Sequence, residues 1–259
     1  GVGPARPDRR EWRMIMADRN IRIDVDGTEV PAYLALPEGS GPHPGMLVIE
    51  EIFGVNDQIR DVCRRFASEG YAAISVEHFH RETKPLTPYA DREAAGGKMR
   101  RLKDTEMVAE MRAGVDYLKA LVEVNEDRVG VIGYCLGGTL SYLAAAKMPD
   151  LAACVVYYGT AIVNDDLNEN TPVAPISLTK DIHCPVLGHF AENDHAVPLE
   201  HVEQIKGALS DAAKTHEVFV YEGALHAFFR DNDPNRYHPD AAGLSWRRTL
   251  SFLEKNLKG

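Results

Sequence analysis

The 259 residues carry 39 acidic and 29 basic side chains, a formal net charge of -10 at pH 7, and this acidic excess disfavours nucleic acid and anionic membranes as partners. A hydrophobic share of 44% allows a sizeable core, and the length fits one large α/β domain. Four widely spaced cysteines without a Cys-x-x-Cys pair indicate neither a zinc site nor a disulfide framework, which suits a cytoplasmic protein.

The chain opens with a basic stretch that contains proline and glycine, residues 1–20, which we interpret as an N-terminal arm before a single domain at 21–259. Arg9-Arg10 would suit a twin-arginine export signal. However, Asp18 and Arg19 interrupt the apolar run that such a signal requires. No stretch approaches the ~20 apolar residues that a membrane span needs.

Two strands are predicted first, at 21–25 and 28–36, joined as an antiparallel hairpin by the turn signal Asp26-Gly27. Further on, apolar runs without alternation indicate buried strands, and apolar residues three or four apart indicate helices. In chain order these are strand 45–49, helix 57–69, strand 71–76, helix 103–122, strand 129–134, helix 136–147, strand 152–158, strand 185–190, helix 199–212, strand 217–221 and helix 240–256. The alternation predicts an α/β fold with a mainly parallel sheet and helices on both faces.

The sequence Gly133-Tyr134-Cys135-Leu136-Gly137 has the Gly-x-nucleophile-x-Gly pattern of a nucleophile elbow, with sulfur in place of the usual serine oxygen. Glycine is needed on both sides because a Cβ there would collide with the neighbouring strand or helix. The turn would present the Cys135 thiol and leave the Leu136 N–H at a helix N-terminus, where it can stabilise a thiolate or an oxyanion. A buried structural cysteine beside a Gly-rich turn is the alternative.

A thiol nucleophile needs a base, and the base needs an acid that orients it. Asp194 and His226 follow Cys135 in the chain order of α/β-hydrolase triads, and each comes just after a predicted strand. The three side chains should therefore meet at one edge of the sheet. Taken singly, Asp194 could be a turn-forming residue and His226 a packed histidine. His195 is the poorer base candidate because it shares the loop of Asp194.

Four motifs together resemble the dienelactone hydrolase family, from about Ile21 to the C-terminus. They are Glu51-Ile52-Phe53-Gly54, Gly133-Tyr134-Cys135-Leu136-Gly137-Gly138, Asn193-Asp194-His195-Ala196-Val197-Pro198 and His226-Ala227-Phe228-Phe229-Arg230. The resemblance implies an α/β-hydrolase fold and hydrolysis of dienelactone (carboxymethylenebutenolide) to maleylacetate, in the degradation of chloroaromatic compounds. It calls for no cofactor and no metal ion.

The resemblance also implies roles for residues near the nucleophile. Glu51 would contact Cys135, and a carboxylate there would disfavour the thiolate through repulsion between like charges until substrate arrives. The oxyanion hole would consist of the backbone N–H groups of Ile52 and Leu136.

Two arginines, Arg81 and Arg230, would grip a carboxylate of the substrate, since a guanidinium can hold a carboxylate through two parallel hydrogen bonds. Local pairing of Arg81 with Glu82, or of Arg230 with Asp231 or Asp233, is the alternative. The expected partner is therefore a small anionic lactone or ester, and the expected intermediate is an acyl thioester.

The loop at 77–89 is a candidate wall of the pocket because it is long and follows a strand. Its His78 and His80 we interpret as ordinary histidines rather than as a metal site. Two other functions stay open: a broad-specificity carboxylesterase, and a catalytically silent binding protein with the same fold. The presence of nucleophile, acid, base and both arginines favours an enzyme.

Overall fold

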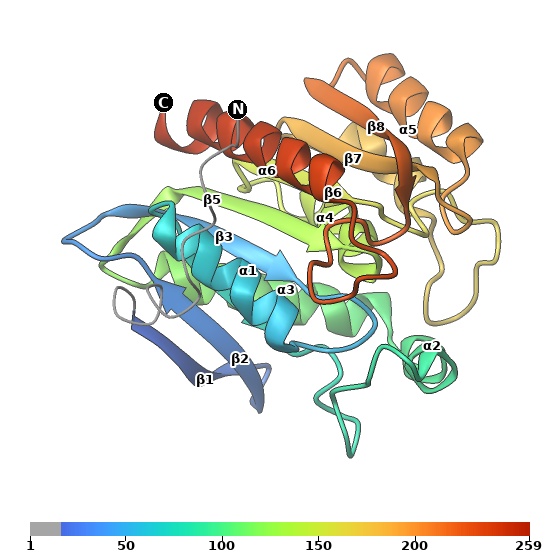
Figure 1. The fold of residues 1–259 in the computed structure, drawn as a ribbon. Coiled ribbons are helices and arrows are strands. Elements are labelled where there is room, and N and C mark those ends of the chain that lie inside the picture. The colour runs from blue at the N-terminus through green and yellow to red at the C-terminus, as the bar shows by residue number, and fades with distance from the viewer. Residues whose placement is uncertain (1–16) are drawn as a thin grey trace.

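Residues 17–259, the part of the chain that the computed structural model describes, fold around one mainly parallel sheet (Figure 1). Its eight strands are β1 (Ala17–Val25), β2 (Thr28–Leu36), β3 (His43–Ile49), β4 (Ala72–Val76), β5 (Val124–Tyr134), β6 (Ala153–Tyr157), β7 (Val186–Asn193) and β8 (His216–Leu225). They lie in the order β1-β2-β4-β3-β5-β6-β7-β8. β2 pairs antiparallel with both β1 and β4, and every pair from β4 to β8 is parallel, which confirms the predicted sheet.

Helices cover both faces of the sheet. In chain order they are α1 (Asp57–Ser68), α2 (Arg92–Met99), α3 (Asp104–Lys119), α4 (Leu136–Lys147), the short η2 (Pro175–Asp181), α5 (Leu199–Asp211), α6 (Pro239–Leu253) and the short η3 (Glu254–Lys258). Buried side chains of α3, α4 and α5 belong to one core, and those of α1 and α6 to the other. Figure 1 shows α1 and α6 together on the near face, with α3 and α4 behind the sheet. The α/β fold class is thereby confirmed.

The apolar run of β3 shows why its sequence does not alternate. Leu47 and Ile49 pack into the core under α3 and α4, whereas Met46 and Val48 pack into the core under α1 and α6. Because both faces are covered, every position from 46 to 49 is at most 1% exposed.

The structure differs from the sequence-based boundaries at several elements, for example at β5, which begins at Val124 rather than at 129. Two further differences concern β1 and α2. β1 begins at Ala17, so four residues that we assigned to the arm pair with β2; the remainder of the arm, residues 1–16, lies outside the described residues. The helix α2 was not predicted, since Gly96 and Gly97 weaken its pattern and Ala95 is its one buried residue. Asp91 caps this helix by accepting a hydrogen bond from the N–H of Ala94 at 3.1 Å.

The carboxyl ends of the parallel strands bring the predicted site residues to one edge of the sheet. Glu51 follows β3, Cys135 follows β5, Asp194 follows β7 and His226 follows β8. Ile49 is in register with Gly133, and Asn193 with Leu225, so the residues after each pair of strands are neighbours. Among residues 17–259, no helix combines the length and the apolar character needed to cross a bilayer.

Candidate active site

Cys135 occupies the turn between β5 and α4 that the motif predicts. Its φ of 57° and ψ of -114° lie outside the conformations that side chains other than glycine ordinarily adopt. A Cβ on Gly133 would lie 1.8 Å from the carbonyl oxygen of Gly137, and one on Gly137 would lie 2.3 Å from that of Ile49. Both glycines are therefore required for the turn that presents the thiol.

His226 links the thiol to a carboxylate. Its Nδ1 lies 2.7 Å from Oδ2 of Asp194. Oδ1 of Asp194 accepts hydrogen bonds from the backbone N–H groups of Ala196 at 2.8 Å and Val197 at 3.1 Å, which fix the carboxylate. Burial acts to lower the pKa of His226, but the charge of Cys135 and hydrogen bonds with Asp194 and Cys135 outweigh burial and raise it to about 10. The site thus favours a protonated imidazole between the sulfur and the carboxylate.

Glu51 and Arg230 form a buried ion pair. Nε of Arg230 donates to Oε2 of Glu51 at 3.0 Å and Nη2 donates to Oε1 at 2.9 Å, and both side chains are 2% exposed. The guanidinium also donates to Asp233 at 3.1 Å and lies 4.2 Å from the ring centre of Tyr89. Arg230 thus binds both oxygens of the Glu51 carboxylate. The expected effect of Glu51 on the Cys135 thiol stays a prediction.

Arg81 belongs to a different cluster, centred on Glu110 of α3. The buried Glu110 carboxylate accepts a hydrogen bond from Nη1 of Arg81, and it lies 2.6 Å from Nδ1 of His78 and 2.9 Å from Nε2 of His80. Burial acts to raise the pKa of Glu110, but its partners outweigh burial and lower it to about 2. Residues 17–259 contain no group of three or more potential ligands arranged to hold a metal ion.

The structure therefore brings Cys135, Asp194 and His226 together but places Arg81 and Arg230 in separate ion-pair clusters. Local pairing of Arg230 with Asp233, an alternative that the sequence left open, is present beside the pair with Glu51. A joint role of the two arginines in holding a substrate carboxylate stays a prediction.

The two backbone N–H groups predicted for an oxyanion hole belong to residues next to the carboxyl ends of paired strands. Leu136 is the first residue of α4, and N–H groups of the first helical turn have no acceptor within the helix. Ile52 follows β3, the strand that pairs with β5. The assignment of these two N–H groups to an oxyanion hole stays a prediction.

The sequence did not lead us to two residues of this region, Tyr158 and Glu110. Tyr158 directly follows β6, has a φ of 39°, and lies edge-on to His226 with ring centres 5.1 Å apart. Its position after a parallel strand is the signal that could have found it. Glu110 was detectable as a charge within the apolar stripe of α3, between Met107 and Met111.

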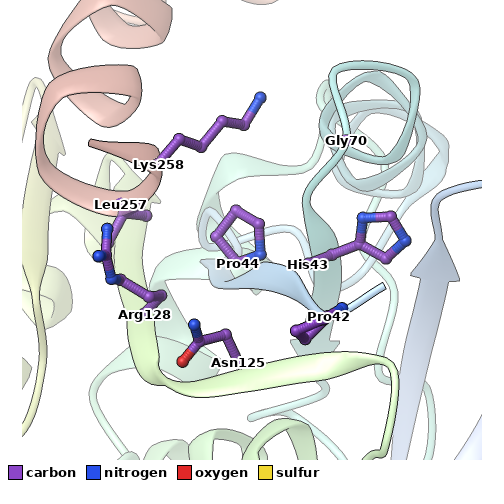
Figure 2. Close-up of a pocket in the computed structure, with 8 residues that line it drawn as sticks. All are labelled: Pro42, His43, Pro44, Gly70, Asn125, Arg128, Leu257 and Lys258. Carbon is purple, nitrogen blue, oxygen red and sulfur yellow. The ribbon is translucent and has the colours of Figure 1, made fainter. Parts of the chain in front are cut away.

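Hollows elsewhere on the surface do not contain the triad. The one in Figure 2 lies at the opposite edge of the sheet, where β3 and β5 begin. His43, Asn125 and Arg128 line it, and no candidate site residue does.

A family model described as "Dienelactone hydrolase family" matches residues 30–257. An Escherichia coli (strain K12) protein named "Putative carboxymethylenebutenolidase" is 36% identical over 238 residues, which are 90% of this chain and 85% of that protein. A Bradyrhizobium protein named "Probable 2-oxo-3-(5-oxofuran-2-ylidene)propanoate lactonase" is 30% identical over 242 residues, which are 92% of this chain and 94% of that protein. The solved structure titled "Putative Dienelactone Hydrolase" from Klebsiella pneumoniae has a TM-score of 0.83 at 33% identity and covers 92% of this chain and 98% of that chain. The length of the match and these identities show that the chain belongs to the dienelactone hydrolase family.

Proposed function

We propose that this hydrolase cleaves a lactone or ester through an acyl thioester on Cys135. The sulfur attacks the carbonyl carbon while His226 holds the thiol proton, and the carbonyl oxygen becomes an oxyanion held by the N–H groups of Ile52 and Leu136. Collapse of this intermediate breaks the carbon–oxygen bond, and His226 gives its proton to the departing oxygen. Water, deprotonated by His226, then attacks the thioester and releases the carboxylic acid and the thiol.

The observation that carries the proposal is the position of His226. Its imidazole contacts both Cys135 and Asp194, and its pKa is raised by these contacts despite burial. A buried histidine without a charged partner has its pKa lowered: His189 contacts only the hydroxyls of Thr249 and Tyr221 through its ring nitrogens, and burial lowers its pKa to about 3. These contacts of His226 support activation of the thiol by the triad.

The first candidate substrate is dienelactone, hydrolysed to maleylacetate, as part of the breakdown of aromatic compounds in the cytoplasm. The names of the relatives support a lactone with a carboxylate, and the four cysteines, all buried free thiols, support a reducing compartment. In this case Arg81 or Arg230 would exchange its present carboxylate partner for the substrate.

The second candidate is an uncharged ester, cleaved by a carboxylesterase of broader specificity. The specific observation that favours it is that both arginines already have carboxylates of the protein as partners. Releasing Arg230 would leave Glu51 without its buried counter-ion, which is costly. An anionic substrate must supply that energy, whereas a neutral ester need not.

A rate comparison distinguishes the two candidates. We expect hydrolysis of cis- and trans-dienelactone and of p-nitrophenyl acetate by the wild type, and no hydrolysis of any of them by Cys135→Ala. The matched control is Cys184→Ala, because Cys184 is similarly buried and burial raises its pKa to about 12. A higher kcat/KM for one dienelactone isomer supports the first candidate, and a higher value for the acetate supports the second. Full turnover by Cys135→Ala contradicts the cysteine mechanism, and no turnover by the wild type supports a binding protein.

A further inference from the structure

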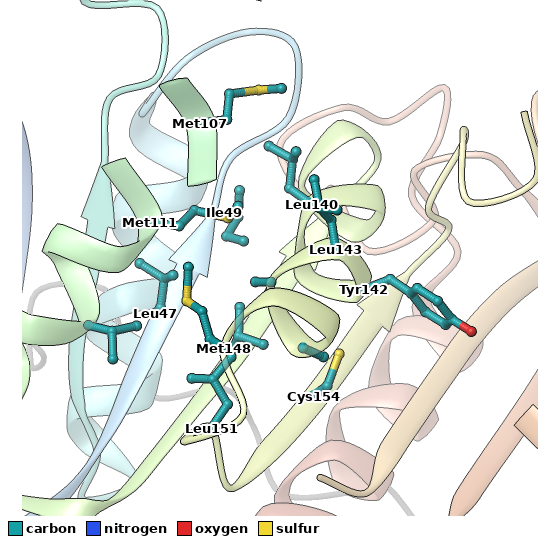
Figure 3. Packing of buried hydrophobic residues seen from close by; sticks show 14 of the residues in the cluster. Leu47, Ile49, Met107, Met111, Leu140, Tyr142, Leu143, Met148, Leu151 and Cys154 are labelled. Atoms are coloured by element: carbon teal, nitrogen blue, oxygen red, sulfur yellow. The ribbon is translucent and has the colours of Figure 1, made fainter. Parts of the chain in front are cut away.

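A hollow of about 500 Å³ lies beside the nucleophile turn, among α2, α3, α4 and the segment at 161–175. Its deep wall is apolar and includes Met107 of α3 and Leu140 and Leu143 of α4, which are at most 3% exposed. Figure 3 shows these three side chains in the space between the two helices. The volume falls within the range of about 300–1,000 Å³ typical of small-molecule pockets.

The hollow adjoins the nucleophile turn at the start of α4. Leu136, the residue after Cys135, lines it, and so does Thr139 one turn later. The Thr139 hydroxyl accepts a hydrogen bond from the backbone N–H of Ala161 at 3.0 Å, which ties the outer wall to the same helix. A group that extends from a carbonyl held at the Leu136 N–H toward α4 would therefore reach this hollow.

The position of His226 decides which part of an ester can enter. The departing oxygen must face the imidazole to receive its proton, and His226 comes from the end of β8, at the far edge of the sheet. The hollow is lined by α3, which packs on β3, β4 and β5, and by residues 161–175, which follow β6. None of its lining residues comes from β8 or from the segment after β8. The alcohol part must therefore point toward β8, and the acyl part toward the hollow.

The charges around the hollow exclude an anionic acyl group. Its lining includes the carboxylates Asp104, Asp166 and Glu169 and a single guanidinium, that of Arg100. Burial raises the pKa of Asp104 because a carboxylate here loses hydration, and an anionic acyl group that entered the hollow would meet the same cost. An uncharged apolar chain meets no such cost and would bury its surface against the wall of leucine and methionine.

We infer that this hollow is an acyl pocket that selects esters with an uncharged, apolar acyl chain of several carbons. The inference rests on the proposed function, since it takes Cys135 as the attacking atom and His226 as the proton donor. It makes Met107, Leu140 and Val173 residues that determine specificity.

The test is a series of p-nitrophenyl esters with acetyl, butyryl and octanoyl chains, in which only the acyl part changes. Val173 lines the mouth and is 38% exposed, so Val173→Trp fills the pocket without overpacking the core. Leu167, in the same segment and 45% exposed, is outside the lining, and Leu167→Trp is the matched control. We expect the wild-type kcat/KM to rise with chain length, and Val173→Trp to lower the octanoyl value by about tenfold or more while the acetyl value changes less than about twofold. Leu167→Trp should leave the series unchanged.

The outcomes separate this inference from the proposed function. The acyl-pocket inference is wrong if the wild-type kcat/KM does not rise with chain length, or if Val173→Trp lowers kcat/KM equally for all three esters. Either result can occur while Cys135→Ala is inactive, as the proposed function predicts. If Cys135→Ala hydrolyses the series as the wild type does, the proposed function fails and the inference fails with it.

Discussion

Glu51 and Arg230 depend on each other because both charges lie in the interior. Two hydrogen bonds join the carboxylate to the guanidinium, and each side chain is 2% exposed. Removing one partner of such a pair leaves a buried charge without compensation, whereas removing both does not. The pair thus restrains the end of β3, the strand next to the nucleophile turn, whichever substrate binds.

Glu51→Gln should lower the free energy of unfolding by about 3 kcal/mol, as expected when a buried ion pair loses one partner. The double variant Glu51→Gln/Arg230→Met should recover most of this loss, because it leaves no buried guanidinium. Urea unfolding followed by circular dichroism measures both. The surface pair of Glu203 with Lys206 gives the control: Glu203→Gln should cost less than about 1 kcal/mol. A loss for Glu51→Gln no larger than for the control would contradict this account of the pair.

At the scale of elements, Glu110 connects α3 to the loop that follows β4. One carboxylate binds His78, His80 and Arg81, three residues of the loop predicted as a pocket wall. His78 also donates its backbone N–H to Glu50 at 2.9 Å. The loop is thus fixed to a buried charge as well as to the apolar core, in which its Phe79 packs.

The lowered pKa of Glu110 predicts an acid-sensitive contribution to stability. A glutamate with a pKa of about 4.3 when unfolded and about 2 when folded stabilises the protein by about 3 kcal/mol above pH 5. Because the folded pKa is the lower one, this contribution is lost as the pH falls through the unfolded value toward 2. Urea unfolding should therefore show Glu110→Gln clearly less stable than the wild type at pH 7, with the difference shrinking toward pH 3.

The control for this series is Glu106→Gln on the same helix. Glu106 is 31% exposed and pairs with exposed Lys103 and Arg81. Glu106→Gln should therefore lower the free energy of unfolding only slightly at every pH. A difference between Glu110→Gln and the wild type that stays constant from pH 7 to pH 3 would show that the carboxylate does not act through its charge.

At the scale of the whole molecule, the sequence predicts those features that depend on neighbouring residues. Apolar runs predict the buried strands, because both faces of these strands pack into a core. Gly133 and Gly137 predict the nucleophile turn, because no other residue fits at either position. The chain order of Cys135, Asp194 and His226 then predicts their meeting at one edge, because parallel strands end together.

The pairing of charged residues could not be predicted in the same way. Glu51 and Arg230 are 179 positions apart, and Arg81 and Glu110 are 29 apart, so their contacts depend on how the elements pack. Local candidates such as Glu82 for Arg81 were equally plausible from sequence, yet Glu82 pairs with Arg101. The short helix α2 escaped prediction because little of it is buried.

The central claim, that Cys135 carries the acyl group, is tested most directly by trapping the intermediate. The reaction with p-nitrophenyl butyrate is quenched in acid within the first turnover, and the digested protein is mapped by mass spectrometry. The account predicts a butyryl group on the peptide that contains Cys135, lost on longer incubation and absent from Cys135→Ala. A butyryl group on a different residue, or turnover of the ester by Cys135→Ala at the wild-type rate, would contradict it.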